Sequence, residues 1–127
     1  MAQKYIIGDL VKYKVGGLEF IAEITNTSKY GYCFKGVSDD ISGTLCKEFA
    51  KDIPLTPEIL EKNGWKYFGN RLYWSPNEEG VGVCLSSQTG YVWKAYIGRH
   101  IIRSNINSVS DLQHLLFGLG LNLEMEV

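Results

Sequence analysis

The sequence has no long apolar run and no excess of charge of either sign. Thirteen Lys and Arg residues are balanced by fourteen Asp and Glu residues, which leaves a formal net charge of −1. No apolar stretch approaches the roughly 20 residues that a membrane-spanning helix needs, and Asp9 interrupts the N-terminal segment too early for a signal peptide. We therefore expect a soluble cytoplasmic protein with no membrane partner and no global field that would attract nucleic acid.

Cysteine and histidine are scarce and poorly spaced for metal binding. The three cysteines, Cys33, Cys46 and Cys84, form no C-x-x-C pair and have no histidine at zinc-ligand spacing. Their odd number indicates buried free thiols in a reducing compartment. Neither His100 nor His114 has a cysteine or carboxylate at ligand spacing, so the sequence predicts no metal site and no cofactor.

Recognisable catalytic motifs are absent as well. Ser86 and Ser87 have no G-x-S-x-G elbow around them. Glu78 and Glu79 lie in a Pro-Asn-Glu-Glu-Gly segment that is typical of a solvated turn. Residues 80–83 lack the third glycine and the following helix of a dinucleotide-binding loop. We therefore expect a protein that is not an enzyme; an enzyme with an unfamiliar site is an alternative that no group of residues supports.

The first part of the chain, residues 5–54, is patterned as short strands. Apolar and polar residues alternate in four segments, at residues 11–15, 18–24, 30–34 and, more weakly, 41–45. Gly16-Gly17 between the first two segments suits the positive φ angles of a two-residue hairpin turn, and Glu side chains opposite the lysine-bearing strand would form cross-strand ion pairs. This pattern predicts an SH3-like barrel or a strongly curled sheet.

The second part, residues 55–127, opens with a short connecting helix. Thr56 can cap this helix, Pro57 suits its first position, and Gly64 ends it. A second β-meander of four strands is predicted at residues 65–68, 71–74, 81–86 and 91–97.

A helix and a strand are predicted to complete the chain. Ser108 and Asp111 form a capping box ahead of an apolar stripe of helical period, which Gly120 ends. Residues 121–127 alternate strictly between apolar and polar, which predicts a C-terminal strand with one face in the core. The predicted fold class is therefore α+β, mostly antiparallel β, in a single domain over residues 1–127.

Residues 53–65, Ile-Pro-Leu-Thr-Pro-Glu-Ile-Leu-Glu-Lys-Asn-Gly-Trp, resemble a recurring stretch in small uncharacterised accessory proteins of phages and mobile elements in gut Bacteroides-type bacteria. Those proteins often open with an Ile-Gly-Asn strand and end with a helix containing Leu-Gln-Asn-Leu. Residues 7–9 and 112–115 of this chain are similar, but they carry Asp9 and His114 in place of Asn. The resemblance implies no activity and no functional residues; it implies an accessory protein expressed in a bacterial host.

Aromatic and basic residues interleave between residues 74 and 103. Aromatic rings stack on bases, and Arg side chains grip phosphates with paired donors. Strand parity places Trp93 in the core and points Lys94 and Tyr96 the other way. The predicted ligand-binding set consists of Trp74, Lys94, Tyr96, Arg99 and Arg103. The alternative interpretation is an ordinary half-buried strand with solvated Lys and Arg side chains.

The leading hypothesis is a non-enzymatic anti-defence protein, which binds and sequesters a nucleotide-type immune signal of the host or blocks a host defence protein. It combines the absence of catalytic groups, the aromatic-basic set and the phage-like context. Sequestration by stacking and phosphate contacts needs no general base. Such a pocket can lie between symmetric copies, so the hypothesis is compatible with a homo-oligomer.

The alternative is an SH3-like nucleic-acid or protein-interaction module over residues 5–37. Its interleaved basic and aromatic residues are Lys12, Tyr13, Lys14, Lys29, Tyr30, Tyr32, Phe34 and Lys35. Glu19 and Glu23 oppose a strong phosphate track, so nucleic acid is the less favoured partner. A further alternative is a structural accessory protein with no small-molecule ligand.

Overall fold

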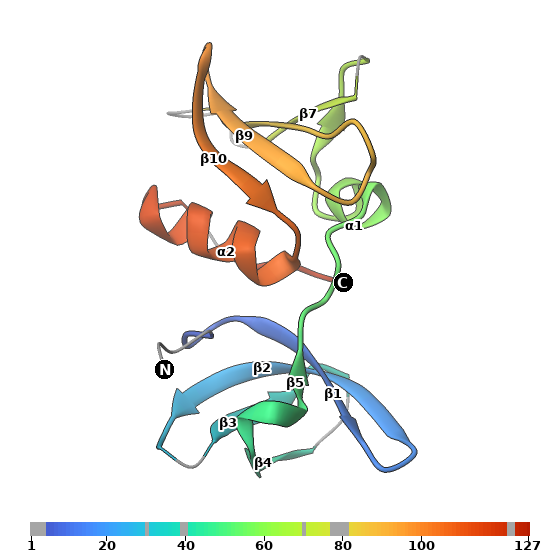
Figure 1. The fold of residues 1–127 in the computed structure, drawn as a ribbon, viewed down its shortest axis with the longest axis vertical. Coiled ribbons are helices and arrows are strands. Elements are labelled where there is room, and N and C mark those ends of the chain that lie inside the picture. Colours follow the sequence, from blue (N-terminus) through green and yellow to red (C-terminus); the bar gives the residue numbers. More distant parts are fainter. Residues whose placement is uncertain (1–4, 30, 39–40, 70, 77–81, 122–123) are drawn as a thin grey trace.

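The structure of the 127-residue chain is a computed structural model that describes residues 5–29, 31–38, 41–69, 71–76, 82–121 and 124–127. This part of the chain forms two five-stranded antiparallel sheets and two α-helices (Figure 1). The prediction of an α+β fold that is mostly antiparallel β is confirmed. None of the helices in the described ranges is long and apolar enough to cross a bilayer.

The first sheet is formed by the described residues of 5–52, which we call the first lobe. Its strands are β1 (Leu10–Val15), β2 (Leu18–Thr27), β3 (Tyr32–Gly36), β4 (Ser42–Leu45) and β5 (Ala50–Lys51), with a 3₁₀ turn, η1 (Lys47–Phe49), before β5. The strand order is β4-β3-β2-β1-β5, so the last strand returns to pair with the first. The predicted β1–β2 hairpin is confirmed: Gly16 has φ +60°, and Lys12 Nζ lies 3.7 Å from Glu19 Oε1.

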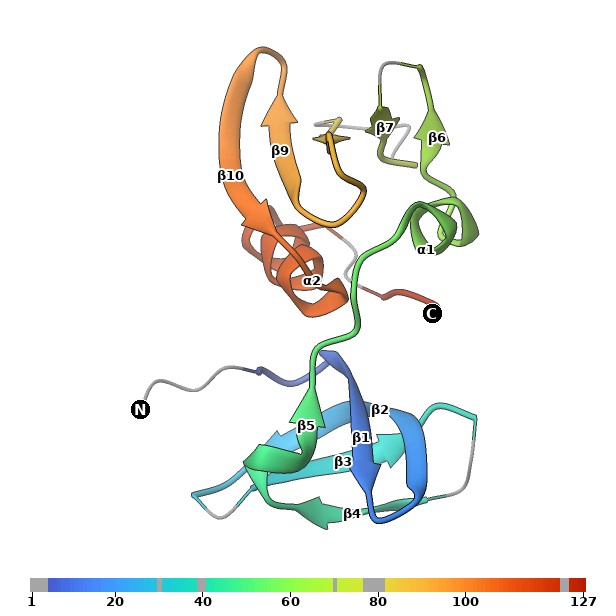
Figure 2. The same ribbon diagram turned by 45° about the vertical axis from the view of Figure 1, so that its right-hand side comes forward.

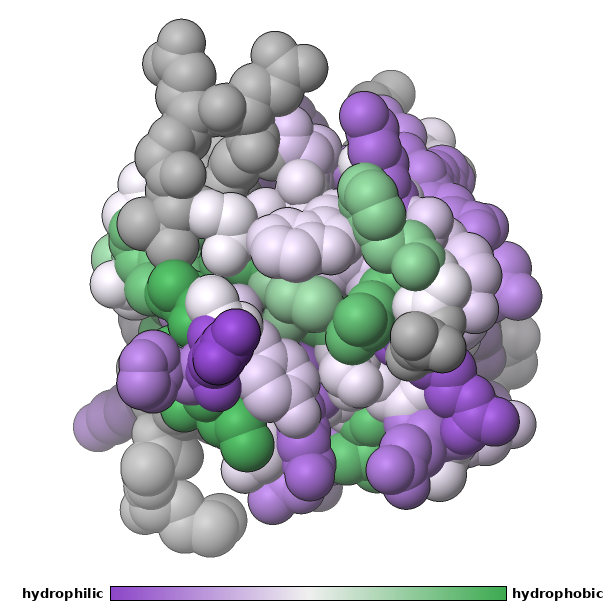
Figure 3. All heavy atoms as spheres, turned by 90° about the horizontal axis from the view of Figure 1, so that it is seen from above, coloured by the Kyte–Doolittle hydropathy of each residue, from purple (hydrophilic) through white to green (hydrophobic). Residues whose placement is uncertain are grey.

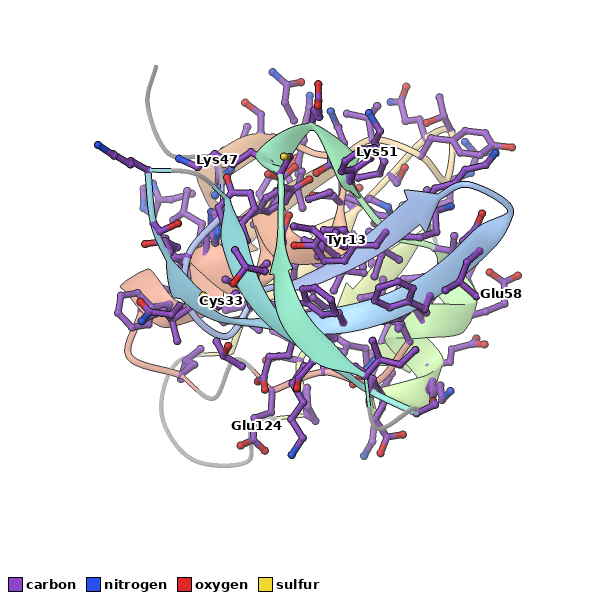
Figure 4. All side chains as sticks on the ribbon, turned by 90° about the horizontal axis from the view of Figure 1, so that it is seen from below. Tyr13, Cys33, Lys47, Lys51, Glu58 and Glu124 are labelled. Carbon is purple, nitrogen blue, oxygen red and sulfur yellow. The ribbon has the colours of Figure 1, made fainter. Side chains whose placement is uncertain are left out.

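Aromatic side chains fill the interior of the first lobe. Tyr13 packs against Phe34 and Phe20, with ring centroids 4.9 and 5.5 Å apart. Figure 4 views this lobe from below and shows Tyr13 inside the curl of the sheet. Rings buried in this way are the main source of stability in a small sheet, because burial of apolar area contributes about 25 cal/mol per Å².

The second sheet lies in residues 53–127, which we call the second lobe. Its elements are α1 (Pro57–Lys62), β6 (Lys66–Tyr67), β7 (Leu72–Trp74), β8 (Cys84–Ser86), β9 (Trp93–Ile97), β10 (His100–Ile106) and α2 (Val109–Gly118). The strand order β10-β9-β8-β7-β6 is a simple meander. A meander was predicted for the four strands β6 to β9. Both predicted helix starts are confirmed, since Thr56 Oγ1 accepts a hydrogen bond from Ile59 N and Ser108 Oγ accepts one from Asp111 N.

Helix α2 lies between the two sheets in both ribbon views (Figures 1 and 2). Its buried face, including Leu112 and Leu116, joins the core of the second lobe together with Trp93. Leu10 of β1 belongs to the same core, so the first lobe contributes to the packing of the second. The chain crosses between the lobes after β5, where Leu55 N donates to Asn107 O.

The sequence missed one strand, and two of its predictions need correction. The missed strand is β10: its register is irregular between Ile101 and Arg103 and between Arg103 and Ile106, which destroys the alternation that marks a strand. The C-terminal strand is wrong for residues 124–127, which belong to no sheet; residues 122–123 lie outside the described part. Buried thiols are found only at Cys84, because Cys33 is half-buried and Cys46 is exposed.

Candidate functional site

The strand register of the second sheet gathers several predicted site residues on one face. Residues paired directly across antiparallel strands point to the same side of a sheet. One row across the sheet consists of Lys66, Trp74, Cys84, Tyr96 and Ile101. The neighbouring row consists of Phe68, Leu72, Ser86 and Lys94. We call these nine positions the outer face.

The opposite side of the same strands faces the core. Tyr73, Leu85 and Ala95 pair across the sheet and are all buried. Trp93 is 1% exposed, and its indole Nε1 donates to Leu55 O at 3.0 Å. The prediction that Trp93 belongs to the core is confirmed, and the outer face is therefore the side of the sheet that points away from α2.

Large apolar side chains on the outer face are exposed to solvent. Phe68 is 63% exposed, Ile101 56% and Trp74 39%, and the Phe68 and Trp74 rings meet edge to face with centroids 6.2 Å apart. Figure 3 views the molecule from this side and shows hydrophobic and weakly polar surface across the middle of the view. Contiguous apolar surface of this kind marks a binding surface more often than scattered single residues do.

Small residues on β8 and just before it let the Trp74 ring lie close to the sheet. A Cβ atom added at Gly82 would lie 3.3 Å from Trp74 Cζ3, so the indole occupies the space above this glycine. Cys84, the next residue on this side of β8, is 7% exposed. Burial raises the pKa of the Cys84 thiol, which keeps it protonated and unsuited to nucleophilic chemistry.

The charges on the outer face are all basic. Lys66 stands in the row of Trp74, and Lys94 in the neighbouring row; both are exposed. None of the nine positions carries an acidic residue. The nine positions thus offer aromatic rings for stacking and ammonium groups for an anion.

The structure brings together only part of the predicted ligand-binding set. Trp74, Lys94 and Tyr96 share the outer face. Arg99 lies in the exposed turn between β9 and β10, beyond the end of this face. Arg103 pairs with Ala95 on the core side, and its guanidinium contacts Asp111 Oδ1 at 3.4 Å and Asp111 O at 3.3 Å. The Arg103 side chain is 36% exposed, but it lies apart from the outer face, because the irregular register of β10 brings its guanidinium to Asp111 of α2.

Three of the four aromatic residues in the set proposed for residues 5–37 are buried, although its lysines lie at or near the surface. Tyr13, Tyr32 and Phe34 are 0, 2 and 5% exposed, so they are unavailable for stacking on bases. Burial raises the pKa of Tyr13 to about 12, and its hydroxyl has no hydrogen-bond partner among the described residues. Tyr30 lies outside the described part of the chain, as do Glu78 and Glu79.

A polar cluster at the junction of the lobes was not predicted. The Asp9 side chain has no solvent exposure, and its Oδ2 accepts from Ile6 N at 2.9 Å and lies 2.5 Å from His114 Nε2. Its Oδ1 has no partner in the described residues. Burial raises the pKa of Asp9, against the opposing effect of the Ile6 amide and His114.

Gln113, next to His114 on α2, completes this junction. Its Oε1 accepts from Leu10 N at 2.8 Å and its Nε2 donates to Gly8 O at 3.0 Å. One buried side chain therefore satisfies two backbone groups at the start of β1. No local sequence signal could reveal this cluster, since its partners are more than 100 residues apart in the chain.

The comparisons with known proteins add no relationship to this description. No protein-family model matches the chain, no curated protein matches its sequence, and no solved structure matches its fold. Within the described ranges, no group of three or more His, Cys, Asp and Glu side chains is placed to hold a metal ion.

Proposed function

We propose that this chain is a non-enzymatic binding protein that holds a nucleotide-type ligand on its outer face. The observation that carries the proposal is that Trp74, Tyr96 and Phe68 share one face with Lys66 and Lys94, and that none of its nine described positions carries an acidic residue. A nucleotide combines a planar base with an anionic phosphate, and these are the two groups that such a face complements.

Stacking on the exposed rings would supply most of the affinity. Base–aromatic stacking is worth about 1–3 kcal/mol per base, and it tolerates different bases because each has a π-face. The lysines would contact phosphate as point charges, and Arg99 at the β9–β10 turn could reach a phosphate beyond the end of the face. A shallow face of this kind would enclose its ligand more fully if two copies faced each other.

The biological role that we propose is sequestration of a nucleotide-type defence signal in the cytoplasm of a bacterial host. The resemblance of residues 53–65 to phage and mobile-element accessory proteins supports it, because such proteins act inside the infected cell. Blocking of a host defence protein is the alternative within the same context.

We further infer that the first lobe is an SH3-like barrel that serves as a scaffold. Its meander of four strands, with β5 returning to pair with β1, is an arrangement by which a five-stranded sheet can close on itself. Its aromatic residues are used for the interior, which leaves the outer face of the second sheet as the better place for a nucleotide.

A binding experiment with defined nucleotides tests the proposal. Cyclic dinucleotides, ADP-ribose and short single-stranded oligonucleotides would be titrated by calorimetry and by tryptophan fluorescence. We expect a bound base to quench the exposed Trp74, whereas the buried Trp65 and Trp93 respond little. Preference for a free nucleotide over an oligonucleotide supports a signal-binding role, and the reverse preference supports single-stranded nucleic acid as the source of the same chemistry.

Matched variants locate the site. Trp74→Ala and Lys94→Ala should weaken binding at least tenfold, whereas Phe117→Ala and Lys51→Ala, exposed residues on α2 and β5, should leave it unchanged. Absence of binding to every nucleotide tested overturns the proposed function. Binding that is indifferent to Trp74→Ala and Lys94→Ala moves the site away from the outer face.

A further inference from the structure

Trp74 and Tyr96 flank a small residue in one row of the outer face. Trp74 pairs with Cys84, and Cys84 pairs with Tyr96, so the row passes from ring to cysteine to ring over three neighbouring strands. Adjacent strands lie about 4.8 Å apart, which places the α-carbons of the two aromatic residues about 10 Å apart. The outer face therefore presents two aromatic side chains at a spacing that the sheet determines.

The Trp74 ring is held in place by its neighbours. A Cβ atom at Gly82 would lie 3.3 Å from Cζ3 and 3.6 Å from Cε3 of Trp74, and the Phe68 ring meets the indole edge to face. Trp74 is nevertheless 39% exposed, and Tyr96 is half-buried at its position on β9. An aromatic side chain that is already fixed loses little conformational freedom when a base stacks on it.

Hydrogen-bond donors stand beside the space between the two rings. Cys84 lies between them and is only 7% exposed, so it adds little bulk to this part of the surface. Ser86 and Lys94 are the next residues on the same side of β8 and β9, and they pair with each other. A hydroxyl and an ammonium group are both donors to phosphate oxygen. These donors therefore lie where the link between two bases would pass.

The spacing of the rings decides how many bases the face can hold. Consecutive bases that stack on each other lie about 3.4 Å apart, whereas the two aromatic residues are about three times farther apart. A ligand that contacts both rings must therefore hold its bases apart from each other. Sheets that bind single-stranded RNA use this arrangement, in which each splayed base stacks on its own aromatic side chain. A mononucleotide has only one base and contacts one ring.

We infer that the outer face binds two bases joined by a phosphodiester link, one base on Trp74 and the other on Tyr96, with the linking phosphate beside Ser86 and Lys94. This inference rests on the proposed nucleotide-binding function and specifies its ligand class, a dinucleotide unit. A free dinucleotide and a single strand both contain this unit.

Calorimetry with matched adenine ligands tests the two-base inference. The ligands are adenosine monophosphate, the 5′-phosphorylated diadenylate, and the diadenylate with an abasic sugar in place of either adenosine. The abasic forms keep the charge and the backbone, so the comparison isolates one base. We expect the diadenylate to bind more tightly than either abasic form by roughly fivefold to a hundredfold, the range that stacking of one base supplies.

Variants of Tyr96 then place the second base. Tyr96→Ala should abolish the advantage of the diadenylate over its abasic forms and change the affinity for adenosine monophosphate by less than twofold. Tyr96→Phe keeps the ring and should keep the advantage. Tyr91→Ala is the matched control, because Tyr91 is 74% exposed and belongs to none of the nine positions of the outer face. The abasic comparison uses the wild-type protein, so it decides the question even where Tyr96→Ala does not fold.

The outcomes separate this inference from the proposed function. If adenosine monophosphate binds and the diadenylate binds no more tightly than its abasic forms, the two-base inference fails and the proposed function stands. Equal losses of both ligands in Tyr96→Ala would also overturn it. Absence of binding by every ligand overturns both. A tetra-adenylate that binds more tightly than the diadenylate assigns the unit to a single strand, and equal binding assigns it to a free dinucleotide; both results support two bases.

Discussion

His114 Nε2 of α2 lies 2.5 Å from Oδ2 of Asp9, a side chain with no solvent exposure at the start of the first sheet. The two residues are 105 positions apart and belong to different lobes. The contact therefore joins the two lobes with an ionisable pair.

Replacement of Asp9 by Asn should change how stability depends on pH. Burial raises the pKa of Asp9 above its ordinary value of 3.8, so the folded protein holds this proton more tightly than the unfolded chain does. The contribution of Asp9 is therefore full below pH 3.8 and is lost as the pH rises through the raised pKa. Each unit of the shift is worth about 1.4 kcal/mol. Relative to wild type, Asp9→Asn should gain stability as the pH rises.

Urea denaturation between about pH 4 and about pH 7 measures this difference. The groups that act on Asp9 are His114, the Ile6 amide and the more distant Asp111, and all three stay in place in the variant. Glu48→Gln replaces an exposed acid and serves as the control. Its free energy of unfolding should depend on pH in the same way as that of wild type. A constant difference between Asp9→Asn and wild type would contradict the assignment of a raised pKa.

Replacement of Gln113 by Leu should destabilise the chain strongly without changing its volume much. Gln113 is 1% exposed and is the hydrogen-bond partner of both Leu10 N and Gly8 O. Each buried backbone group left without a partner costs about 1–3 kcal/mol, so we expect a loss of about 2–5 kcal/mol in the free energy of unfolding. Gln88→Leu, at an exposed position, is the matched control and should change stability by less than about 0.5 kcal/mol.

The sequence predicted those parts of the fold that depend on local chemistry. The β1–β2 hairpin follows from Gly16-Gly17 between two alternating segments, and the helix starts follow from Thr56 and Ser108 as caps. Strand β10 could not be predicted, because its bulges allow consecutive residues such as Ile101 and Ile102 to be exposed together. The C-terminal alternation was misread because the side chain of Asn63, the residue that follows α1, takes the place of a partner strand.

The candidate site shows the same division. Strand parity predicted that Lys94 and Tyr96 share a face, which needs only the period of two along one strand. It could not predict Lys66 and Phe68 beside Trp74, because these contacts depend on the register between strands, which the period along one strand does not determine. The Asp9–His114 contact could not be predicted from the sequence either, because it depends on how α2 docks between the sheets.

Replacement of Gly31 by Ala should distort the first sheet. A Cβ atom at this buried position would lie 2.0 Å from the carbonyl oxygen of Leu45, a backbone atom that cannot rotate away. The strands would have to separate, and overpacking of this kind costs about 1–3 kcal/mol or more. Gly17→Ala, with nothing within 4 Å of its added methyl group and no positive φ, is the matched control. Equal melting temperatures for the two variants would contradict the close approach at Gly31.

Replacement by Phe should destabilise the chain far more at Trp93 than at Trp74, the two tryptophans of the second sheet. Trp93 is 1% exposed and donates to Leu55 O, so Trp93→Phe leaves a buried carbonyl without its donor and a small cavity beside it. We expect a loss of about 2–4 kcal/mol in the free energy of unfolding. Trp74 is 39% exposed on the outer face, and Trp74→Phe should cost no more than about 0.5 kcal/mol.

Chemical denaturation of the two variants, followed by circular dichroism, checks this contrast. The comparison also decides how the nucleotide titrations are interpreted: if Trp74→Phe is as stable as wild type, any loss of binding in Trp74 variants reflects the missing indole rather than unfolding. Should Trp74→Phe prove as damaging as Trp93→Phe, the indole above Gly82 would be a structural part of the sheet, and the case for the outer face as a stacking surface would fail.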